Sequence, residues 1–465
     1  MTTNKKDYGI SLFIFRRDLR LDDNTALIEA LTKSEQVIPC FIIDPRQVGE
    51  SNKYKGEKLL QFMYESLVDL DEALSKHNKR LFYFYGEAEQ VIEKLLKEIK
   101  PGALFVNSDY TIFSQKRDAK IKSICETSKT DFVSLDDALL CPPGSVLKDN
   151  KQAYTVYTPF YRKALSSVEI RKPKTNKFTN FYSKPIKSEI SDPLKKIKFK
   201  KNNQQYVSGG RTTGLQLLKS LKNLGDYKDQ RNFPAVSGTS KLSPHHKFGT
   251  ISIRETYHYA KKHFGQDSTF ISELYWRDFF SHIAFFNPHV FKGSFRKEYD
   301  NLDWENDKRL FDFWCQGQTG FPIVDAGMRE LLNSGFMHNR VRMIVASFLT
   351  KDLLISWRWG ERWFAKHLLD YDPAVNNGNW QWAASTGCDA QPYFRIFNPW
   401  LQQKKFDPDC EYIKKWVPEL RQFSAKQIHG LLLEKNQMPA IYPCPIVDHD
   451  IRRDDAIDMF KEVKN

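Results

Sequence analysis

Apolar residues follow two different rhythms along this chain of 465 residues. Over residues 1–140, short and nearly continuous apolar runs alternate with segments whose apolar positions recur every three or four residues. The first pattern is typical of strands covered on both faces, and the second of amphipathic helices. We therefore predict an α/β domain with a doubly wound parallel sheet of five strands. The predicted strands are 10–15, 37–43, 80–85, 103–106 and 132–135.

The pattern decays over residues 141–205, where Pro, Ser, Asn and Lys dominate. This composition predicts an interdomain connector, with "TPFYRKAL" at 158–165 as its ordered part. The lysine run of the connector is interpreted as a solvated surface.

Residues 206–465 show helical periodicity with hardly one alternating segment, which predicts an all-α domain. All ten tryptophans lie between Trp276 and Trp416. The two halves of the chain are thus expected to carry different chemistry.

Composition narrows the classes of protein to consider. No stretch approaches the roughly 20 apolar residues that a membrane helix needs, and the first residues, "MTTNKKDYG", resemble neither a signal nor a transit peptide. We expect a soluble cytoplasmic protein. The formal net charge of +14 favours an anionic partner, nucleic acid before others. The seven widely spaced cysteines are expected to be reduced, buried thiols, and no metal is predicted.

Familiar catalytic motifs are missing from the sequence. There is no Walker A loop, no GxSxG and no HExxH, which argues against acyl transfer and metal-centred hydrolysis. Candidate chemistry must come from clusters of polar and aromatic residues instead.

Three segments hold such clusters. In "MHNRVRMIVASF", helical spacing puts Asn339 and Met343 on one face, able to contact an apolar ligand, although a helix with two solvated arginines would look the same. In "ISELYWRDFF", Glu273 precedes Trp276 and Arg277 by three and four residues, as in a plain intrahelical ion pair beside a core aromatic. In "DYDPAVNNGNWQWAAS", two carboxylates could cap a helix, accept from ribose hydroxyls or pair with an arginine, for which Arg342 is a candidate.

Taken together, these segments resemble the class I cyclobutane pyrimidine dimer photolyases of the photolyase/cryptochrome family. The similarity runs from "FRRDLRLDDN" near the start to "YPCPIVDH" near the end, and is densest in "ELYWRDFF" and "NNGNWQWAASTGCDAQPYFRIFNP". The resemblance implies a helical domain that binds FAD. It also implies light-dependent repair of pyrimidine dimers in UV-damaged DNA, by electron transfer from photoexcited reduced FAD to a flipped-out dimer.

The resemblance also assigns residues. The implied FAD-binding residues are Tyr227, Thr239, Ser240, Lys241, Leu242, Ser243, Arg277, Asn339, Arg342, Asp370, Asp372 and Asn376. The implied catalytic and lesion-contacting residues are Glu273, Trp276, Asn339, Met343, Asn376 and Trp382. The tryptophans implied to carry an electron inward from the surface are Trp304, Trp357 and Trp380. The DNA-binding residues implied are Arg231, Glu273, Trp276, Arg277, Asn339, Arg340, Trp382, Arg395 and Gln402.

Physical chemistry gives these assignments a rationale. A dimer is already poorly stacked, so extruding it costs only a few kcal/mol, and photolyases are among the enzymes that act by such base flipping. Stacking on a tryptophan is worth about 1 to 3 kcal/mol per base. We hypothesise that Glu273, kept neutral by burial, donates a hydrogen bond that stabilises the charged dimer. Asn376, which carries no charge, suits a position beside the reduced flavin and favours repair over signalling.

Some positions depart from the family pattern. Lys241 stands where many relatives have arginine, and His245, His246 and Phe270 also differ from usual residues. Ser51, Phe113 and Ser114 occupy positions where a folate-type antenna site would have His, Asn and Glu, although Lys292 matches. The sequence thus leaves open which antenna chromophore the α/β domain binds: a folate, a deazaflavin, another chromophore or none.

Three alternative functions remain to be separated. A (6-4) photolyase is associated with a histidine pair near the lesion, whereas His338 is followed by Asn339. A cryptochrome-type photoreceptor would bind FAD without repair, but Asn376 and the lack of a long C-terminal tail after "DMFKEVKN" speak against it. A plain nucleic-acid-binding module would not explain "TSKLS" together with "DYD". In each photolyase case, a monomer on the nucleoid that needs no protein partner is expected.

Overall fold

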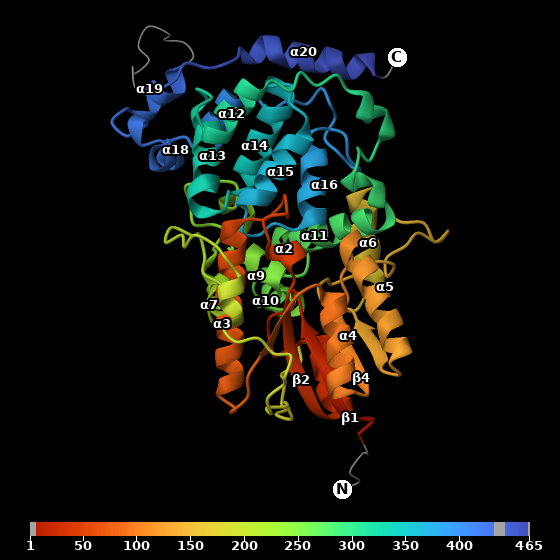
Figure 1. Cartoon of the computed structure of the whole chain (residues 1–465). Coiled ribbons are helices and arrows are strands. Elements are labelled where there is room, and N and C mark those ends of the chain that lie inside the picture. The colour runs from red at the N-terminus through yellow and green to blue at the C-terminus, as the bar shows by residue number, and fades with distance from the viewer. Residues whose placement is uncertain (1–5, 432–441, 464–465) are drawn as a thin grey trace.

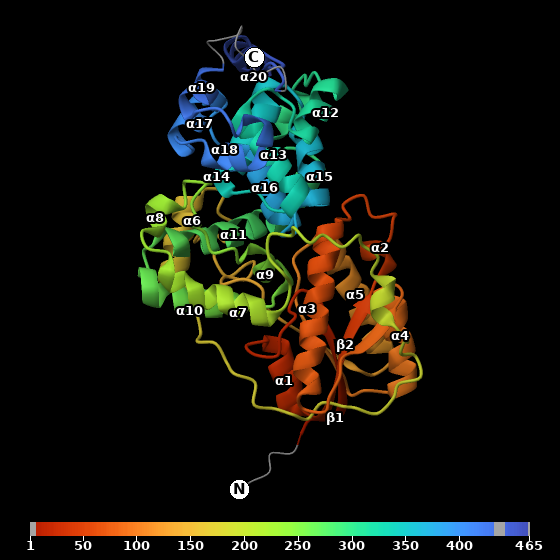
Figure 2. The same ribbon diagram turned by 90° about the vertical axis from the view of Figure 1, so that its left-hand side faces the viewer.

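The computed structural model describes residues 6–431 and 442–463, which form two stacked parts. Figures 1 and 2 show the α/β part below and the helical part above, with the C-terminal helix α20 (His449–Glu462) at the top.

The α/β part contains one five-stranded sheet, as predicted. All neighbouring strands are parallel, in the order β3-β2-β1-β4-β5. The strands are β1 (Tyr8–Phe15), β2 (Ser34–Ile43), β3 (Phe82–Tyr85), β4 (Ala103–Asn107) and β5 (Asp131–Leu135). The helices of this part are α1 (Thr25–Lys33), α2 (Pro45–Val48), α3 (Glu57–Ser75), α4 (Ala88–Ile99) and α5 (Ile112–Thr127).

Alternation along the strands explains why helices cover both faces. Phe13 and Phe15 of β1 pack in one apolar cluster with residues of α1 and α3. Leu12 and Ile14 point the other way, into a second cluster with residues of α4 and α5. Because both faces are apolar, the strands read as continuous hydrophobic runs.

The connector 141–205 is ordered and packed rather than loose. Its main helix, α6 (Tyr157–Ser167), contains the predicted ordered segment, and a 3-10 turn, η1 (Pro193–Lys196), follows later. Phe181 forms a bridge beside Val37 of β2 and is buried in the core. The connector therefore runs back over the sheet before the chain enters the helical part.

Among the residues that the structure describes after 206, helices and turns occur and no strand, in line with the predicted all-α domain. Its α-helices before α20 are α7 (Arg211–Ser220), α8 (Tyr227–Gln230), α9 (Ser243–Phe248), α10 (Ile253–Phe264), α11 (Thr269–Phe286), α12 (Lys308–Gln316), α13 (Pro322–Ser334), α14 (Asn339–Ser347), α15 (Trp357–His367), α16 (Pro373–Ala383), α17 (Pro399–Phe406), α18 (Glu411–Trp416) and α19 (Ala425–Gly430). Shorter turns are η2 (Leu221–Asn223), η3 (Pro288–Phe291), η4 (Lys297–Asn301), the π-helix η5 (Phe348–Asp352) and η6 (Pro418–Leu420). No helix among residues 6–431 and 442–463 is long and apolar enough to cross a membrane.

A buried ionic network joins the two parts. Asp137, just after β5, accepts from Arg20 of the β1–α1 loop at 2.5 Å and from Arg254 of α10 at 2.6 Å. Arg254 also contacts Asp23 at 2.8 Å. Although burial favours the neutral acid, the two arginines hold the pKa of Asp137 below its ordinary value. This network fixes the "RRDLRLDDN" loop against the helical part.

The prediction for the cysteines is confirmed at six positions and wrong at one. Six cysteines are buried free thiols, whereas Cys444 is exposed. It stands in the loop before α20, where residues 443–448 are all intermediate or exposed.

Candidate functional site

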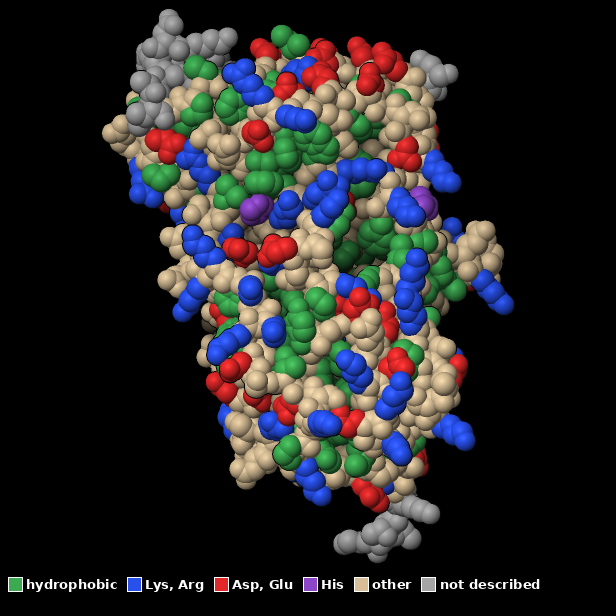
Figure 3. All heavy atoms as spheres, in the orientation of Figure 1, with side chains coloured by type: hydrophobic (Ala, Val, Ile, Leu, Met, Phe, Trp, Pro, Cys, Tyr) green, Lys and Arg blue, Asp and Glu red, His purple; other side chains and the backbone are tan. Residues whose placement is uncertain are grey.

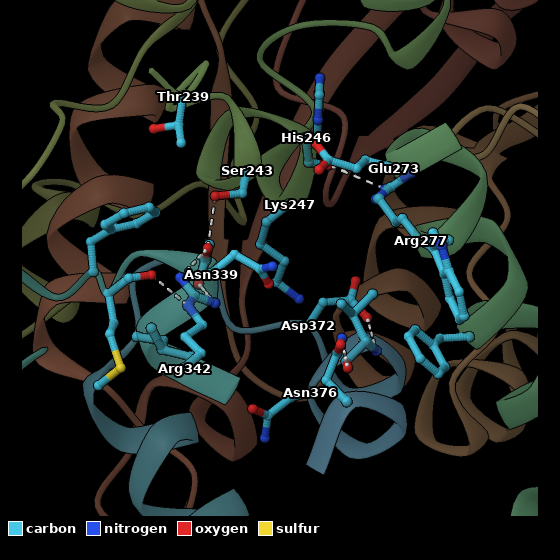
Figure 4. A pocket seen from close by; sticks show the side chains of 18 of the residues that line it. Thr239, Ser243, His246, Lys247, Glu273, Arg277, Asn339, Arg342, Asp372 and Asn376 are labelled. Atoms are coloured by element: carbon cyan, nitrogen blue, oxygen red, sulfur yellow. Dashed lines mark hydrogen bonds and ion pairs between the residues drawn. The ribbon is translucent and has the colours of Figure 1, made fainter. Parts of the chain in front are cut away.

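A cavity of about 520 Å³ lies within the helical part. Its walls come from α8, the loop 239–243, α9, α11, α14 and α16 (Figure 4). All twelve residues that the sequence resemblance assigned to FAD line this cavity, as do Glu273, Trp276, Met343 and Trp382. One pocket therefore contains both the expected cofactor set and the expected lesion set.

Arg342 and Asp370 form a two-pronged ion pair on one side of the cavity. The guanidinium Nη2 lies 2.9 Å from Oδ2 of Asp370, and Nη1 lies 3.3 Å from Oδ1. The Ser243 hydroxyl donates to the same carboxylate at 2.7 Å, and Arg342 Nε donates to the Met337 carbonyl. The pair thus ties α14 to α9 and matches the pairing expected from the sequence.

Asp372 links the cavity to the α/β part. Its Oδ2 lies 2.6 Å from Nη2 of Arg17, and Tyr110 donates its hydroxyl to Oδ1. The same oxygen caps α16 by accepting from the backbone of Ala374. Although burial favours the neutral acid, Arg17 and other nearby cations hold the pKa of Asp372 below its ordinary value. Asp372 therefore caps α16 and also lines the cavity. The capping role and the role in the site that were inferred from the sequence are compatible.

Glu273 is held by two neighbours at the opposite wall. Its Oε1 lies 2.7 Å from Nη2 of Arg231, and Oε2 accepts from the Tyr227 hydroxyl. Burial raises the pKa of Glu273, while Arg231 and the tyrosine hydrogen bond oppose that rise. Glu273 does not form the intrahelical ion pair with Arg277 that its spacing allowed. Arg277 instead donates to the Ala138 carbonyl at 2.7 Å.

Trp276 has one face covered and one face toward the cavity wall. The Tyr157 ring of α6 stacks on it with a centroid distance of 3.7 Å and an interplanar angle of 11°. The Tyr157 hydroxyl donates to the Ser272 carbonyl, which fixes the ring. Trp382 lines the same cavity from α16 and is likewise only partly buried.

Asn376 and Asn339 place amides at the cavity from two helices. Asn376 Nδ2 donates to the Glu361 carbonyl at 3.1 Å, which orients its side chain. Asn339 Nδ2 lies 3.9 Å from the Met343 sulfur, so the two share a helix face as their spacing predicted.

The three tryptophans expected to carry an electron lie in or against one apolar core. Trp380 lines the cavity and is buried, Trp357 is buried in the same apolar cluster, and Trp304 is only partly buried and packs against that cluster. Gly360 permits close packing here, because a Cβ at that position would lie 2.1 Å from the Trp380 ring. The gradient from buried to partly exposed fits an inward route.

Three predicted DNA-binding residues lie outside the cavity lining. Arg340 donates to the Asn232 side chain at 2.6 Å and lies near Arg231, which lines the cavity. This position is compatible with a contact to a DNA phosphate near the mouth of the cavity. Arg395 is exposed and Gln402 partly exposed on a different stretch of surface. The structure does not bring these two into the pocket.

Sequence reasoning missed several residues of the site. Lys247, His246, Phe280, Phe336 and Tyr371 also line the cavity. Burial and Arg17 lower the pKa of Lys247 to about 8. The position of Lys247 four residues after Ser243 on α9 was a signal that helical spacing could have used.

Histidine placement bears on the (6-4) alternative. His338 is the N-cap of α14, where its ring accepts from the Arg340 backbone, and it does not line the cavity. His246 is the one histidine among the described lining residues, and its ring lies 2.8 Å from the Thr256 hydroxyl. The described cavity therefore has no histidine pair.

Comparison with known proteins settles the family. A model of the DNA photolyase family matches residues 11–177, and a model of the FAD-binding domain of DNA photolyase matches residues 270–462. The deoxyribodipyrimidine photo-lyase of Vibrio cholerae is 37% identical, over 97% of this chain and 99% of that protein. The chain belongs to the DNA photolyase family.

Solved structures of the family share the architecture. An archaeal photolyase from Sulfolobus tokodaii, described as having two FAD molecules, is 45% identical with a TM-score of 0.88, and 97% of this chain and 100% of that one are covered. A Synechocystis cryptochrome is 29% identical with a TM-score of 0.87, over 97% and 99% of the chains. Because a cryptochrome shares the fold so closely, the fold alone does not separate repair from signalling.

The lining residues of this photolyase-family site fit FAD. Hydroxyls of Thr239, Ser240 and Ser243 stand with Lys241 on one loop, which suits a pyrophosphate. Carboxylates and amides line the same cavity, and the aromatic rings of Phe336 and Trp380 provide apolar surface for flat rings. This mixture of donors and apolar surface is what a dinucleotide cofactor requires.

Proposed function

We propose that this protein is a deoxyribodipyrimidine photo-lyase that repairs cyclobutane pyrimidine dimers in DNA in a light-dependent reaction. The observation that carries the proposal is the single cavity in which the FAD-fitting residues meet Glu273, Trp276 and Trp382. The identity of 37% with a named photo-lyase over nearly the whole chain supports it.

The residues divide the work of the reaction. When bound, reduced FAD supplies the light-excited electron that splits the dimer. Trp276 and Trp382 offer flat surfaces for the extruded bases, and Tyr157 holds Trp276 in place from behind. The Arg342–Asp370 pair fixes the wall between α14 and α9, so that the cofactor is held without rearrangement. Asn376 provides an uncharged amide oriented by the Glu361 carbonyl.

We infer that DNA binding changes the partners of Glu273. Arg231 pairs with Glu273 in the structure and is also an expected phosphate contact. If Arg231 turns to a DNA phosphate, Glu273 loses the cation that opposes its raised pKa. The neutral acid is then favoured and can donate a hydrogen bond to a dimer carbonyl, which stabilises the added charge.

Replacing Glu273 tests this role. We expect Glu273→Ala to slow ring splitting about tenfold or more, because a hydrogen bond to a charged group is worth about 1.5 to 3 kcal/mol. Glu273→Gln, which can still donate, should lose less. Flash measurements of dimer splitting per absorbed photon provide the check, and an unchanged yield in the alanine variant would remove Glu273 from the mechanism.

The pH dependence of that yield follows from the same group. Since burial raises the pKa of Glu273, its neutral form is present below that pKa and is lost as the pH rises through it. Repair by the unaltered protein should therefore fall toward alkaline pH, whereas Glu273→Gln, which does not titrate, should show no such fall.

Salt dependence tests the DNA-binding assignments. If Arg231, Arg340 and Arg395 contact phosphates, replacing each by alanine should flatten the log–log slope of affinity against salt by roughly 1. Arg453→Ala is a suitable control, because this exposed arginine of α20 pairs with Asp454 far from the cavity. Titrations of damaged duplex at several salt concentrations give the slopes, and three unaltered slopes would place the DNA surface elsewhere.

We further propose a light-harvesting chromophore of the flavin or deazaflavin type in the α/β part. The Sulfolobus tokodaii photolyase is described as having two FAD molecules, with the implication of a novel light-harvesting cofactor. Here the exposed Phe113 ring lies 5.1 Å from the Arg46 guanidinium and 5.8 Å from that of Arg117, a cationic and aromatic surface. Ser51 and Ser114 lack the groups expected for a folate. An additional absorption band after reconstitution with flavins tests this assignment.

The partner in this proposal is UV-damaged DNA. We propose that the protein works as a monomer in the cytoplasm, on the nucleoid, without a protein partner. The basic composition, with a net charge of +14, supports a polyanionic substrate.

The visible spectrum and a repair assay together separate the alternative functions. The reduced protein is mixed with oligothymidylate dimers and kept dark or exposed to blue light. Flavin with light-dependent loss of dimers supports a photolyase, flavin without repair supports a photoreceptor, and a preparation that takes up no FAD supports a nucleic-acid-binding module.

A further inference from the structure

A second cavity, of about 480 Å³, lies where α3 begins and α15 ends. It shares no lining residue with the flavin cavity. Its lining residues are Lys55, Glu57, Lys58, Lys200, Lys201, Asn202, Asn203, Lys366 and His367. Lys200 and Lys201 belong to the connector's lysine run, which the proposed repair reaction does not use.

The lining carries far more positive than negative charge. Five lysines face one glutamate, a net charge of +4 with His367 neutral. Lys55 pairs with Glu50, which lies outside the cavity. The other four lysines form no ion pair or side-chain hydrogen bond with another residue in 6–431 or 442–463. Because like charges repel, such a cluster is stabilised by an anion.

The start of α3 adds to this positive potential. The helix begins at Glu57 after Gly56, and no side chain caps it. Its first backbone N–H groups and the positive end of its dipole therefore remain available to an anion. Lys58 stands at that end, where a cation is disfavoured, and burial lowers the pKa of its ammonium group. Burial and the two cations Lys58 and Lys366 lower the pKa of His367 to about 4.

Contacts of the connector with α3 and α13, and of Gly56 with α15, hold the cavity in shape. The Asn202 backbone N–H donates to Gln61 of α3 at 2.7 Å, and its side chain donates to the Asn333 carbonyl at 2.7 Å. Gly56 packs on α15 so closely that a Cβ would lie 2.8 Å from the Lys366 carbonyl. Figures 1 and 2 both show the upper end of α3 beside α15, and Figure 3 shows Lys and Arg side chains along the junction of the two parts.

We propose that this cavity binds a small ligand with several phosphate charges, either an inorganic polyphosphate or the phosphate chain of a nucleotide. Lysine ammonium groups and free helix N–H groups are the donors that phosphates use. The described lining contains no Phe, Tyr or Trp on which a base could stack, so the phosphate chain is the recognised part.

Calorimetric titration of the FAD-loaded protein with tripolyphosphate, at constant ionic strength, tests the site. We expect saturable binding to the unaltered protein. The double variant Lys58→Gln/Lys201→Gln should bind tripolyphosphate at least about tenfold more weakly, because each substitution removes a charge-assisted hydrogen bond. The control Lys76→Gln/Lys94→Gln replaces two exposed lysines of the same part and should bind as the unaltered protein does. No saturable binding, or equal binding by both double variants, would overturn the proposal.

A second double variant guards against misfolding. Lys200 and Lys366 are exposed, so Lys200→Gln/Lys366→Gln should keep its melting temperature and flavin spectrum while losing affinity for tripolyphosphate. ATP should compete with tripolyphosphate if nucleotides are a source of the ligand, and its failure to compete would leave inorganic polyphosphate as the ligand. Displacement by undamaged duplex DNA would instead assign the surface to nucleic acid and overturn the proposal. Dimer repair should be unaltered in both cavity variants, which separates this test from that of the repair function.

Discussion

Asp137→Ala should lower the free energy of unfolding by about 3 to 5 kcal/mol, the largest loss of stability that we expect from a single substitution. The carboxylate accepts from Arg20 and Arg254 at 2.5 and 2.6 Å, and all three side chains are buried. Its removal leaves two buried guanidiniums without their shared counterion at the junction of the two parts. Thermal and urea unfolding of the FAD-loaded protein provide the measurement.

The neighbouring Asp136 supplies a matched control. It is exposed, so Asp136→Ala should change stability much less. Because the pKa of Asp137 is depressed in the folded state, its contribution is complete above the ordinary carboxyl pKa of about 3.9 and is lost as the pH falls below it. The difference in the free energy of unfolding between the unaltered protein and Asp137→Ala should therefore become smaller at acid pH. Equal unfolding midpoints at neutral pH would show that the network does not join the two parts energetically.

Trp276→Ala should weaken binding of a dimer-containing duplex by about 5- to 150-fold, which corresponds to the roughly 1 to 3 kcal/mol of stacking on one base. Tyr157 covers one face of the indole, so only the cavity-facing side is available to a base. Binding of undamaged duplex, which keeps its bases stacked, should hardly change. Competition titrations with damaged and undamaged duplexes of one sequence measure both affinities.

A graded series sharpens the test of Trp276. Trp276→Phe keeps a smaller aromatic surface and should lose less affinity than the alanine variant. Tyr157→Leu should weaken damage recognition indirectly, because the indole loses the ring at 3.7 Å that supports it. If all three variants discriminate damaged DNA as the unaltered protein does, the lesion does not stack on Trp276.

Much of the fold could be predicted from the sequence because its signals are local. The central strands β2, β1 and β4 are largely buried, so each is a nearly continuous apolar run. The edge strand β5 is only partly buried, but it too falls where the sequence has a short apolar run. Asn339 and Met343 share a face because helical spacing alone requires it. Arg342 could be named from the sequence as a candidate partner of the two carboxylates, and the structure pairs it with Asp370.

Long-range contacts could not be predicted from such signals. Tyr157 of the connector stacks on Trp276, which lies 119 positions later in the chain. The sequence around Tyr157 indicates only the start of an amphipathic helix and does not show which residue the ring will contact. Arg17 and Tyr110 reach Asp372 from the α/β part, a contact that depends on how the two parts dock. The choice of Arg231 rather than Arg277 as partner of Glu273 likewise depends on where α8 lies against α11.

The most direct test is dimer splitting by the reduced, FAD-loaded protein with one bound thymine dimer per molecule. Blue flashes should restore intact thymines in proportion to absorbed photons, and samples kept in the dark should retain their dimers. A protein that binds both FAD and the damaged strand but leaves the dimers intact under illumination would contradict this expectation.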